Sequence, residues 1–160
     1  MKISWTKFES ATREALEKMV LDKYKPNFVV AIGSSGIIPA IMVAKALNIS
    51  DLQIIKVTSY NEENKRSEAQ VLESGLSREL KNKIVLCVDD VFATGGTAEV
   101  VRKEILKFKP KKLKFLVPVV SEFVCKDYPD YWGRSILRSS TDFISMPWDD
   151  FYKIPISRSK

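Results

Sequence analysis

One stretch of the chain decides the fold, and it reads Ile84-Val85-Leu86-Cys87-Val88-Asp89-Asp90-Val91-Phe92-Ala93-Thr94-Gly95-Gly96-Thr97. Its first residues are apolar and rich in β-branched side chains, which predicts a short buried strand. Adjacent carboxylates follow at the end of this strand, then a turn with glycines, and Thr97 opens an amphipathic helix. Backbone N–H groups and the helix dipole favour an anion at such a strand–turn–helix junction. The stretch therefore predicts a phosphate-binding site.

The same stretch resembles the signature with which type I phosphoribosyltransferases bind 5-phosphoribosyl 1-pyrophosphate (PRPP). The resemblance implies that Asp89 and Asp90 hold the ribose hydroxyls, directly or through Mg²⁺, which they would bind directly or through water. A strand capped by an acidic turn without a ligand is the alternative interpretation. A Walker P-loop is excluded because no lysine follows the second glycine. The residues implied to cradle the 5′-phosphate are Ala93, Thr94, Gly95, Gly96 and Thr97.

The composition fits one domain with its own core, since the chain has 160 residues and is 45% hydrophobic. Its net charge of +6 suits an anionic ligand, and it would also suit nucleic acid. The absence of histidine excludes Ser-His-Asp and Cys-His catalysis and histidine-ligated metals. Cys87 and Cys125 show neither metal-ligand spacing nor a disulfide framework. Neither a membrane span nor a signal peptide is recognisable, so we expect a cytoplasmic protein.

Strands and helices are expected to alternate along residues 1–120. Ser4 can cap a helix whose apolar face includes Trp5 and Phe8, both expected to pack in the core. This alternation predicts a parallel α/β sheet wound on both faces, with ligands outside the carboxyl ends of the strands. The other expected elements are strands at 28–32, 53–59, 84–88 and 113–120, and helices from Pro39 to Leu47 and from Thr97 to about Phe108.

A second strand–loop–helix junction is expected at Gly33-Ser34-Ser35-Gly36. In the resembled family a loop at this place binds the pyrophosphate of PRPP through backbone N–H groups. Many relatives, the xanthine-guanine type among them, carry Arg-Gly-Gly there, whereas this chain has Ser34 and Ser35 in place of the Arg and the first Gly. The backbone donors would remain, and the side-chain charge is lost. Taken alone, the loop could as well be an ordinary strand–helix turn.

Residues 59–70 are polar and charged, and a solvated loop is the default interpretation of such a run. The resemblance instead implies the family's flexible catalytic loop, a lid that closes over PRPP and excludes water. Tyr60, Lys65 and Arg66 would then be catalytic, and the two cationic side chains would offset the charge of the leaving pyrophosphate.

Residues 122–160 are rich in aromatic side chains and proline. In the resembled family a small C-terminal hood stacks on the base, which implies a Rossmann-like core at residues 1–121 and a hood at 122–160. Phe143-Ile144-Ser145-Met146-Pro147-Trp148-Asp149 resembles the ending of the xanthine-guanine group, so Phe143 and Ile144 are expected to contact the base. A folded aromatic cap without base contact is the alternative.

The resemblance implies Mg²⁺-dependent transfer of 5-phosphoribosyl from PRPP to a purine nitrogen, giving a nucleoside monophosphate and pyrophosphate. Relatives that use 6-oxopurines carry an Asp where Ala93 stands, and a Lys that donates to the base where Ser121 stands beside Glu122. Replacing Lys by Ser or Glu moves this site from donor toward acceptor. We therefore expect adenine to be preferred, as in adenine phosphoribosyltransferases, which also have Ala at the position of Ala93.

Three alternatives stay open. The chain could be a 6-oxopurine phosphoribosyltransferase, or a regulator that senses PRPP or a nucleotide and binds nucleic acid through its excess lysines. It could also be a non-enzymatic nucleotide-binding subunit. The sequence shows no added DNA-binding domain, so we expect no nucleic-acid partner. We also expect no membrane partner and a homodimer or higher homo-oligomer.

Overall fold

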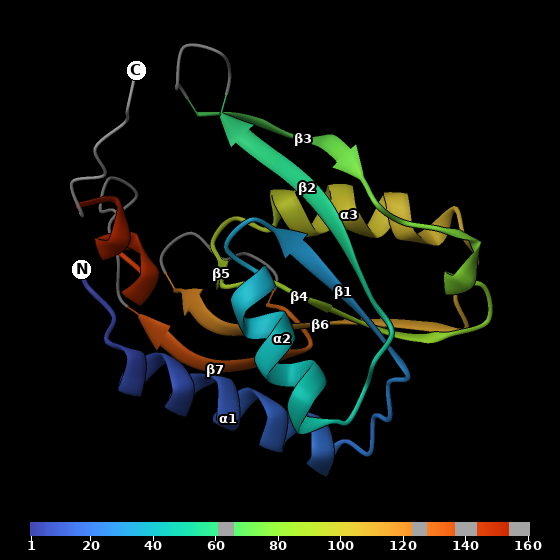
Figure 1. Ribbon diagram of the computed structural model, residues 1–160, viewed down its shortest axis with the longest axis horizontal. Coiled ribbons are helices and arrows are strands. Elements are labelled where there is room, and N and C mark those ends of the chain that lie inside the picture. The colour runs from blue at the N-terminus through green and yellow to red at the C-terminus, as the bar shows by residue number, and fades with distance from the viewer. Residues whose placement is uncertain (61–65, 123–127, 137–143, 154–160) are drawn as a thin grey trace, which may run out of the picture.

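The computed structural model describes residues 1–60, 66–122, 128–136 and 144–153. Within these residues the chain forms one sheet of seven strands in the order β3-β2-β1-β4-β6-β5, and β7 also pairs with β6 (Figure 1). All paired neighbours run parallel except β2 and β3. The predicted α/β fold is confirmed, with a mixed sheet in place of a purely parallel one. The strands are β1 (Phe28–Gly33), β2 (Leu52–Tyr60), β3 (Arg66–Ser74), β4 (Ile84–Val88), β5 (Val91–Phe92), β6 (Lys112–Ser121) and β7 (Tyr131–Ile136).

Helices cover both faces of this sheet. Val29 and Ala31 of β1 belong to the core cluster that includes residues of α1 and α2, whereas Val30 and Ile32 pack in the cluster that includes residues of α3. Successive side chains of a strand point to opposite faces, so a strand covered on both sides needs a continuous apolar run. No helix in the described part of the chain is both long and apolar enough to cross a membrane. The helices are α1 (Trp5–Leu21), α2 (Ile37–Ala46) and α3 (Gly96–Leu106), with 3₁₀ turns η1 (Arg78–Leu80) and η2 (Pro147–Lys153).

The element boundaries differ from the sequence-based expectation by a few residues. Strand β4 matches the expected range 84–88. Helix α2 begins at Ile37, ahead of the expected start at Pro39, because proline is tolerated in the first helical turn, where its missing N–H removes no helical hydrogen bond. Helix α3 ends at Leu106 rather than at Phe108.

Strand β3 corrects the expectation of a polar loop extending to residue 70. Ala69 and Val71 are half-buried in this strand, whereas Glu68 and Gln70 are exposed. The alternation is that of a strand at a sheet edge, where charged residues are common. The charged composition concealed this pattern in the sequence. Residues 61–65, which connect β2 to β3, lie outside the described residues.

Helix α1 begins where it was expected, with the Ser4 hydroxyl accepting a hydrogen bond from the N–H of Lys7 at 3.3 Å. Phe8 is fully buried, as predicted. Trp5 was also expected in the core, yet it is 51% exposed. Its ring lies against Trp148, with 5.9 Å between the ring centroids, so Trp5 covers the rim of the core rather than filling it.

The C-terminal region is divided between the sheet and a separate segment. Residues 122–160 were expected to form a hood, but β7 pairs with β6 in the main sheet, with Tyr131 opposite Leu116. The sheet therefore extends beyond residue 121. Residues 144–153 lie outside the sheet and pack on the start of α1, where Trp148 meets Phe8 edge-on with centroids 4.9 Å apart.

Candidate active site

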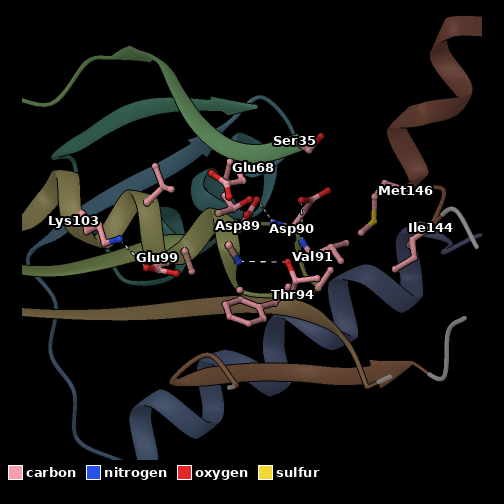
Figure 2. A pocket seen from close by; sticks show the side chains of 18 of the residues that line it. Ser35, Glu68, Asp89, Asp90, Val91, Thr94, Glu99, Lys103, Ile144 and Met146 are labelled. Atoms are coloured by element: carbon pink, nitrogen blue, oxygen red, sulfur yellow. Dashed lines mark hydrogen bonds and ion pairs between the residues drawn. The ribbon is translucent and has the colours of Figure 1, made fainter. Parts of the chain in front are cut away.

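A cavity of about 710 Å³ lies at the carboxyl end of β4, where the chain leads into α3 (Figure 2). Its lining comes from the loop after β1, strand β3, the turn between β4 and α3, the start of α3, and residues 144–149. Ligands of α/β sheets bind at this position because the loops at the carboxyl ends of the strands emerge there together. The charged residues of the lining are Glu68, Asp89, Asp90, Glu99, Lys103 and Asp149.

The acid pair Asp89–Asp90 occupies the break between β4 and β5, which both pair with β6. The N–H of Asp89 donates to the carbonyl of Leu116 at 3.3 Å, which ties the break to β6. Each carboxylate also accepts from the next backbone N–H: Asp89 Oδ1 from Asp90 and Asp90 Oδ1 from Val91, both at 2.9 Å. These bonds fix the orientation of both carboxylates at the cavity wall.

Both acidic side chains lie in an environment that disfavours their negative charge. Burial raises the pKa of Asp89 well above its usual range, and the neighbouring Asp90 charge raises it further. Burial also raises the pKa of Asp90, while its hydrogen bond with Asp89 acts in the opposite direction. A nearby cation or hydrogen-bond donors stabilise the ionised form of a buried carboxylate. The pair is therefore suited to a ligand that brings a cation and hydroxyl groups.

The glycine turn after the acid pair builds the N-terminus of α3. Gly95 has φ of 87°, in the left-handed region that favours glycine, and it caps α3 without a side-chain hydrogen bond. The first helical hydrogen bond runs from the N–H of Glu99 to the carbonyl of Gly95 at 2.9 Å. The preceding N–H groups lie at the helix start beside the cavity, where the N–H of Gly96 donates to the Thr94 hydroxyl at 3.5 Å. Such a helix start favours a phosphate.

The loop after β1 is pressed against the acid pair. A Cβ added at Gly36 would lie 3.0 Å from both Cα and Oδ1 of Asp89, so only glycine allows this approach. Ser35 lines the cavity, whereas Ser34 is exposed and its peptide bond with Gly33 is cis. The structure thus brings the predicted pyrophosphate loop next to the predicted ribose site, with Ser35 as the residue that faces the cavity.

The residues expected to contact the base are separated by the fold. Ile144 lines the cavity, but Ser121 is fully buried at the end of β6 and does not. The Ser121 hydroxyl has no hydrogen-bond partner within the described residues. Glu122 is exposed, and its N–H donates to the carbonyl of Ile136 at 3.1 Å. Phe143 lies outside the described residues.

The expected lid residues are described only in part. Tyr60 and Arg66 are partners at the end of the β2–β3 pair, which brings the backbones on either side of the connection together. Lys65 lies outside the described residues. The lid role of residues 59–70 therefore stays a prediction.

Several lining residues were not recognised from the sequence as site residues. Glu68 was hidden in the charged run, and the period-2 pattern of β3 was the signal that could have found it. Asp149 is the last residue of the stretch 143–149 that resembles the xanthine-guanine group, and the sequence predicts no role for its carboxylate. Lys103 is the basic residue among the described lining residues, and its ammonium pairs with Glu99 at 2.7 Å. Acidic groups thus dominate the described cavity.

A helix start that favours a phosphate, beside a carboxylate pair at the carboxyl end of a central strand, is an arrangement suited to a phosphorylated sugar or nucleotide. The family model described as "Phosphoribosyl transferase domain" matches residues 4–149. The chain belongs to this family, which confirms the resemblance to type I phosphoribosyltransferases.

Proteins named as purine phosphoribosyltransferases are among the relatives that match. The chain is similar to a xanthine-guanine phosphoribosyltransferase of Idiomarina loihiensis, with 28% identity over 92% of this chain and 85% of that protein. A xanthine-guanine phosphoribosyltransferase of Desulfotalea psychrophila is 30% identical over 92% of this chain and 84% of its own length. The crystal structure of a purine phosphoribosyltransferase from Pyrococcus horikoshii has a TM-score of 0.76 and 26% identity, covering 99% of this chain and 98% of that one.

Proposed function

We propose that this phosphoribosyltransferase moves the 5-phosphoribosyl group of PRPP to a nitrogen of a 6-oxopurine base. The observation that carries the proposal is the meeting of the acid pair Asp89–Asp90 with the glycine turn 93–97 in one cavity. The first group suits ribose hydroxyls and the second suits a 5′-phosphate. A ligand with both, such as PRPP, would span the two.

The lining of the cavity suggests where the 5′-phosphate, ribose, pyrophosphate and base would each lie. The 5′-phosphate would accept hydrogen bonds from the N–H groups at the start of α3. The ribose would lie over the acid pair. The pyrophosphate would face Ser35, whose neighbour Gly36 lies against Asp89. The base would then lie toward Ile144 and Met146, the apolar lining supplied by the C-terminal segment.

The residues present fit a magnesium ion. Asp89 and Asp90 would hold it, because both carboxylates lie at the wall of a cavity whose described charged lining is mainly acidic. The described residues contain no group of three or more acidic, histidine or cysteine side chains that could hold a metal alone. In proteins Mg²⁺ is usually bound by one or two carboxylates together with substrate phosphate oxygens, and the pair Asp89–Asp90 fits that pattern. When bound, the ion would offset the charge of the pyrophosphate.

The chain's own residues would act by position and charge. As the C1′–oxygen bond to pyrophosphate breaks, positive charge develops on the sugar, and the fixed carboxylates of Asp89 and Asp90 would stabilise it. The helix start of α3 would hold the 5′-phosphate and so keep C1′ in line with the base. The backbone N–H groups of the loop at Ser35 would receive the leaving pyrophosphate.

The choice of a 6-oxopurine rests on the xanthine-guanine relatives, which match over most of their length. They support this base class better than the adenine preference expected from the sequence. Adenine is the second candidate, because Ala93 brings no carboxylate to the cavity and the buried Ser121 supplies no lysine-like donor. A 6-oxo group needs such a donor, and an unpaired polar group costs about 1–3 kcal/mol.

The test is steady-state transfer from PRPP with Mg²⁺ to hypoxanthine, guanine, xanthine and adenine, with the products identified by mass spectrometry. We expect a higher kcat/KM for at least one 6-oxopurine than for adenine. The variant carrying Asp89→Asn and Asp90→Asn is the inactive control. A higher value for adenine would establish the second candidate, and no product with any base would overturn the proposal.

A further inference from the structure

Residues 1–3 are bound to residues 144–150, the segment that supplies Ile144, Met146 and Asp149 to the cavity lining. The N–H of Ile3 donates to the carbonyl of Ser145 at 2.9 Å, and the N–H of Ser145 donates to the carbonyl of Met1 at 2.9 Å. Lys2 and Ser145 are partners in a parallel bridge outside the main sheet. We call residues 1–3 the clamp and residues 144–150 the wall.

Side chains strengthen this connection. The ammonium of Lys2 lies 2.5 Å from a carboxylate oxygen of Asp150. Ile3 is buried, with 6% of its surface exposed, in the cluster that holds Ile144 and Met146. The clamp therefore binds the wall through backbone, charge and apolar contact together.

Hydrogen bonds inside the wall close it into a turn. The N–H of Asp149 donates to the carbonyl of Met146 at 3.0 Å, and residues from Pro147 onward belong to η2. The Asp149 carboxylate accepts from the N–H of Met146 at 2.7 Å, which closes the same turn. Trp148 adds packing against Phe8 of α1. The wall is thus a turn that packs through Ile144 and Met146 on Phe8 and Val119, and the clamp adds the described backbone hydrogen bonds to it from outside.

This arrangement matters because the wall supplies Ile144, Met146 and Asp149 to the cavity. Figure 2 shows Ile144 and Met146 on the side of the cavity away from Lys103 and Glu99. The acid pair and the glycine turn come from other elements, which the sheet and α3 hold in place. A displacement of the clamp would therefore act first on the side of the cavity that Ile144 and Met146 line, whereas the glycine turn is held by α3 on the other side.

We infer that Lys2 and Ile3 are positioning residues that set the affinity for the base without affecting the affinity for PRPP. The inference rests on the proposed function, in which the base lies against Ile144 and Met146. Substituting a residue that only stabilised the fold would raise the Michaelis constants for both substrates or for neither. The clamp predicts a split between the two Michaelis constants.

The experiment compares Lys2→Ala, Asp150→Ala and the double variant with the wild-type chain. An exposed ion pair is a weak contact, so we expect the KM for the base to rise by about two- to fivefold in each single variant. The double variant should show no further rise, and Lys2→Arg should restore the wild-type value. The KM for PRPP should change less than twofold throughout. Lys7→Ala, an exposed lysine on α1, is the matched control and should leave both constants unchanged.

Ile3→Ala tests the apolar part of the clamp, with circular dichroism to establish that the variant is folded. We expect its KM for the base to rise by about tenfold or more, because buried Ile→Ala changes are among the costlier core substitutions. Amide exchange at Ser145 and Asp149 should accelerate in this variant, while exchange in β4 stays slow.

The following results would overturn the inference or one of its steps. An active wild type with unchanged base KM in the folded variants overturns the inference, as does an equal rise in both Michaelis constants. Failure of Lys2→Arg to restore the base KM overturns the ion-pair step. If the wild type transfers to no base, the proposed function fails. The clamp is then judged by exchange alone, and unchanged exchange at Ser145 in Ile3→Ala overturns it.

Discussion

A single methyl group at Gly36 would test whether the loop after β1 is held against the acid pair. A Cβ there would lie 2.4 Å from the carbonyl oxygen of Ile32 and 3.0 Å from Oδ1 of Asp89. Close carbon–oxygen contacts are about 3.3–3.6 Å, so the loop must move by roughly 1 Å. Overpacking of this kind costs about 1–3 kcal/mol. A displacement of about 1 Å in an active site can lower the rate about 100-fold.

We therefore expect Gly36→Ala to lower the free energy of unfolding by about 1–3 kcal/mol and kcat/KM for PRPP by about 10- to 100-fold. Urea denaturation measures the first quantity, and initial rates at varied PRPP measure the second. Gly96→Ala is the control for stability, because its Cβ would meet only the Thr94 hydroxyl at 3.7 Å. Wild-type stability and wild-type kcat/KM in Gly36→Ala would refute the packing of this loop on Asp89.

Four further predictions concern the site and its support. Asp89→Asn with Asp90→Asn should abolish binding of Mg²⁺–PRPP in a folded protein; unchanged affinity by calorimetry would remove the acid pair from the site. A nucleoside monophosphate should raise the melting temperature and the bare nucleoside should not, because the start of α3 is the proposed phosphate site; equal shifts would contradict this. Amides of residues 66–70 should exchange more slowly once PRPP is bound, and equal protection in both states would argue against a lid. Burial, followed by the hydrogen bond to Asp22, raises the pKa of Tyr131 from 10.0 to about 12. Stability should therefore fall as the pH rises from 10 to 12, less so in Tyr131→Phe, and equal slopes in urea denaturation would refute the shift.

The phosphate side of the site is encoded locally and was therefore predictable. Strand β4, the acid pair and the glycine turn lie within residues 84–97, and hydrogen bonds between near neighbours orient them. Each step depends on a residue type whose conformational preference acts over a few positions, such as Gly95 in the left-handed region. The prediction of the fold class follows from the same kind of pattern, because period and length distinguish strands from helices.

The base side could not be predicted in the same way. The resemblance implies a base contact at Ser121, yet the pairing of β7 with β6 leaves this residue fully buried. The adenine preference rests in part on that placement and in part on Ala93. Likewise β7 was assigned to the hood, because its sequence has the aromatic character of the region rather than the apolar run of a central strand.

The sequence by itself determined the strand, the acid pair, the phosphate turn and the family, since these depend on the order of residues within one short stretch. Tertiary structure alone decided which distant segments meet them. Gly36 lies against Asp89, and Ser145 is bound to Ile3, across separations that no local preference spans. Such contacts form where the sheet order and the helix packing bring segments together, and their energies depend on shape and burial that a linear pattern does not contain.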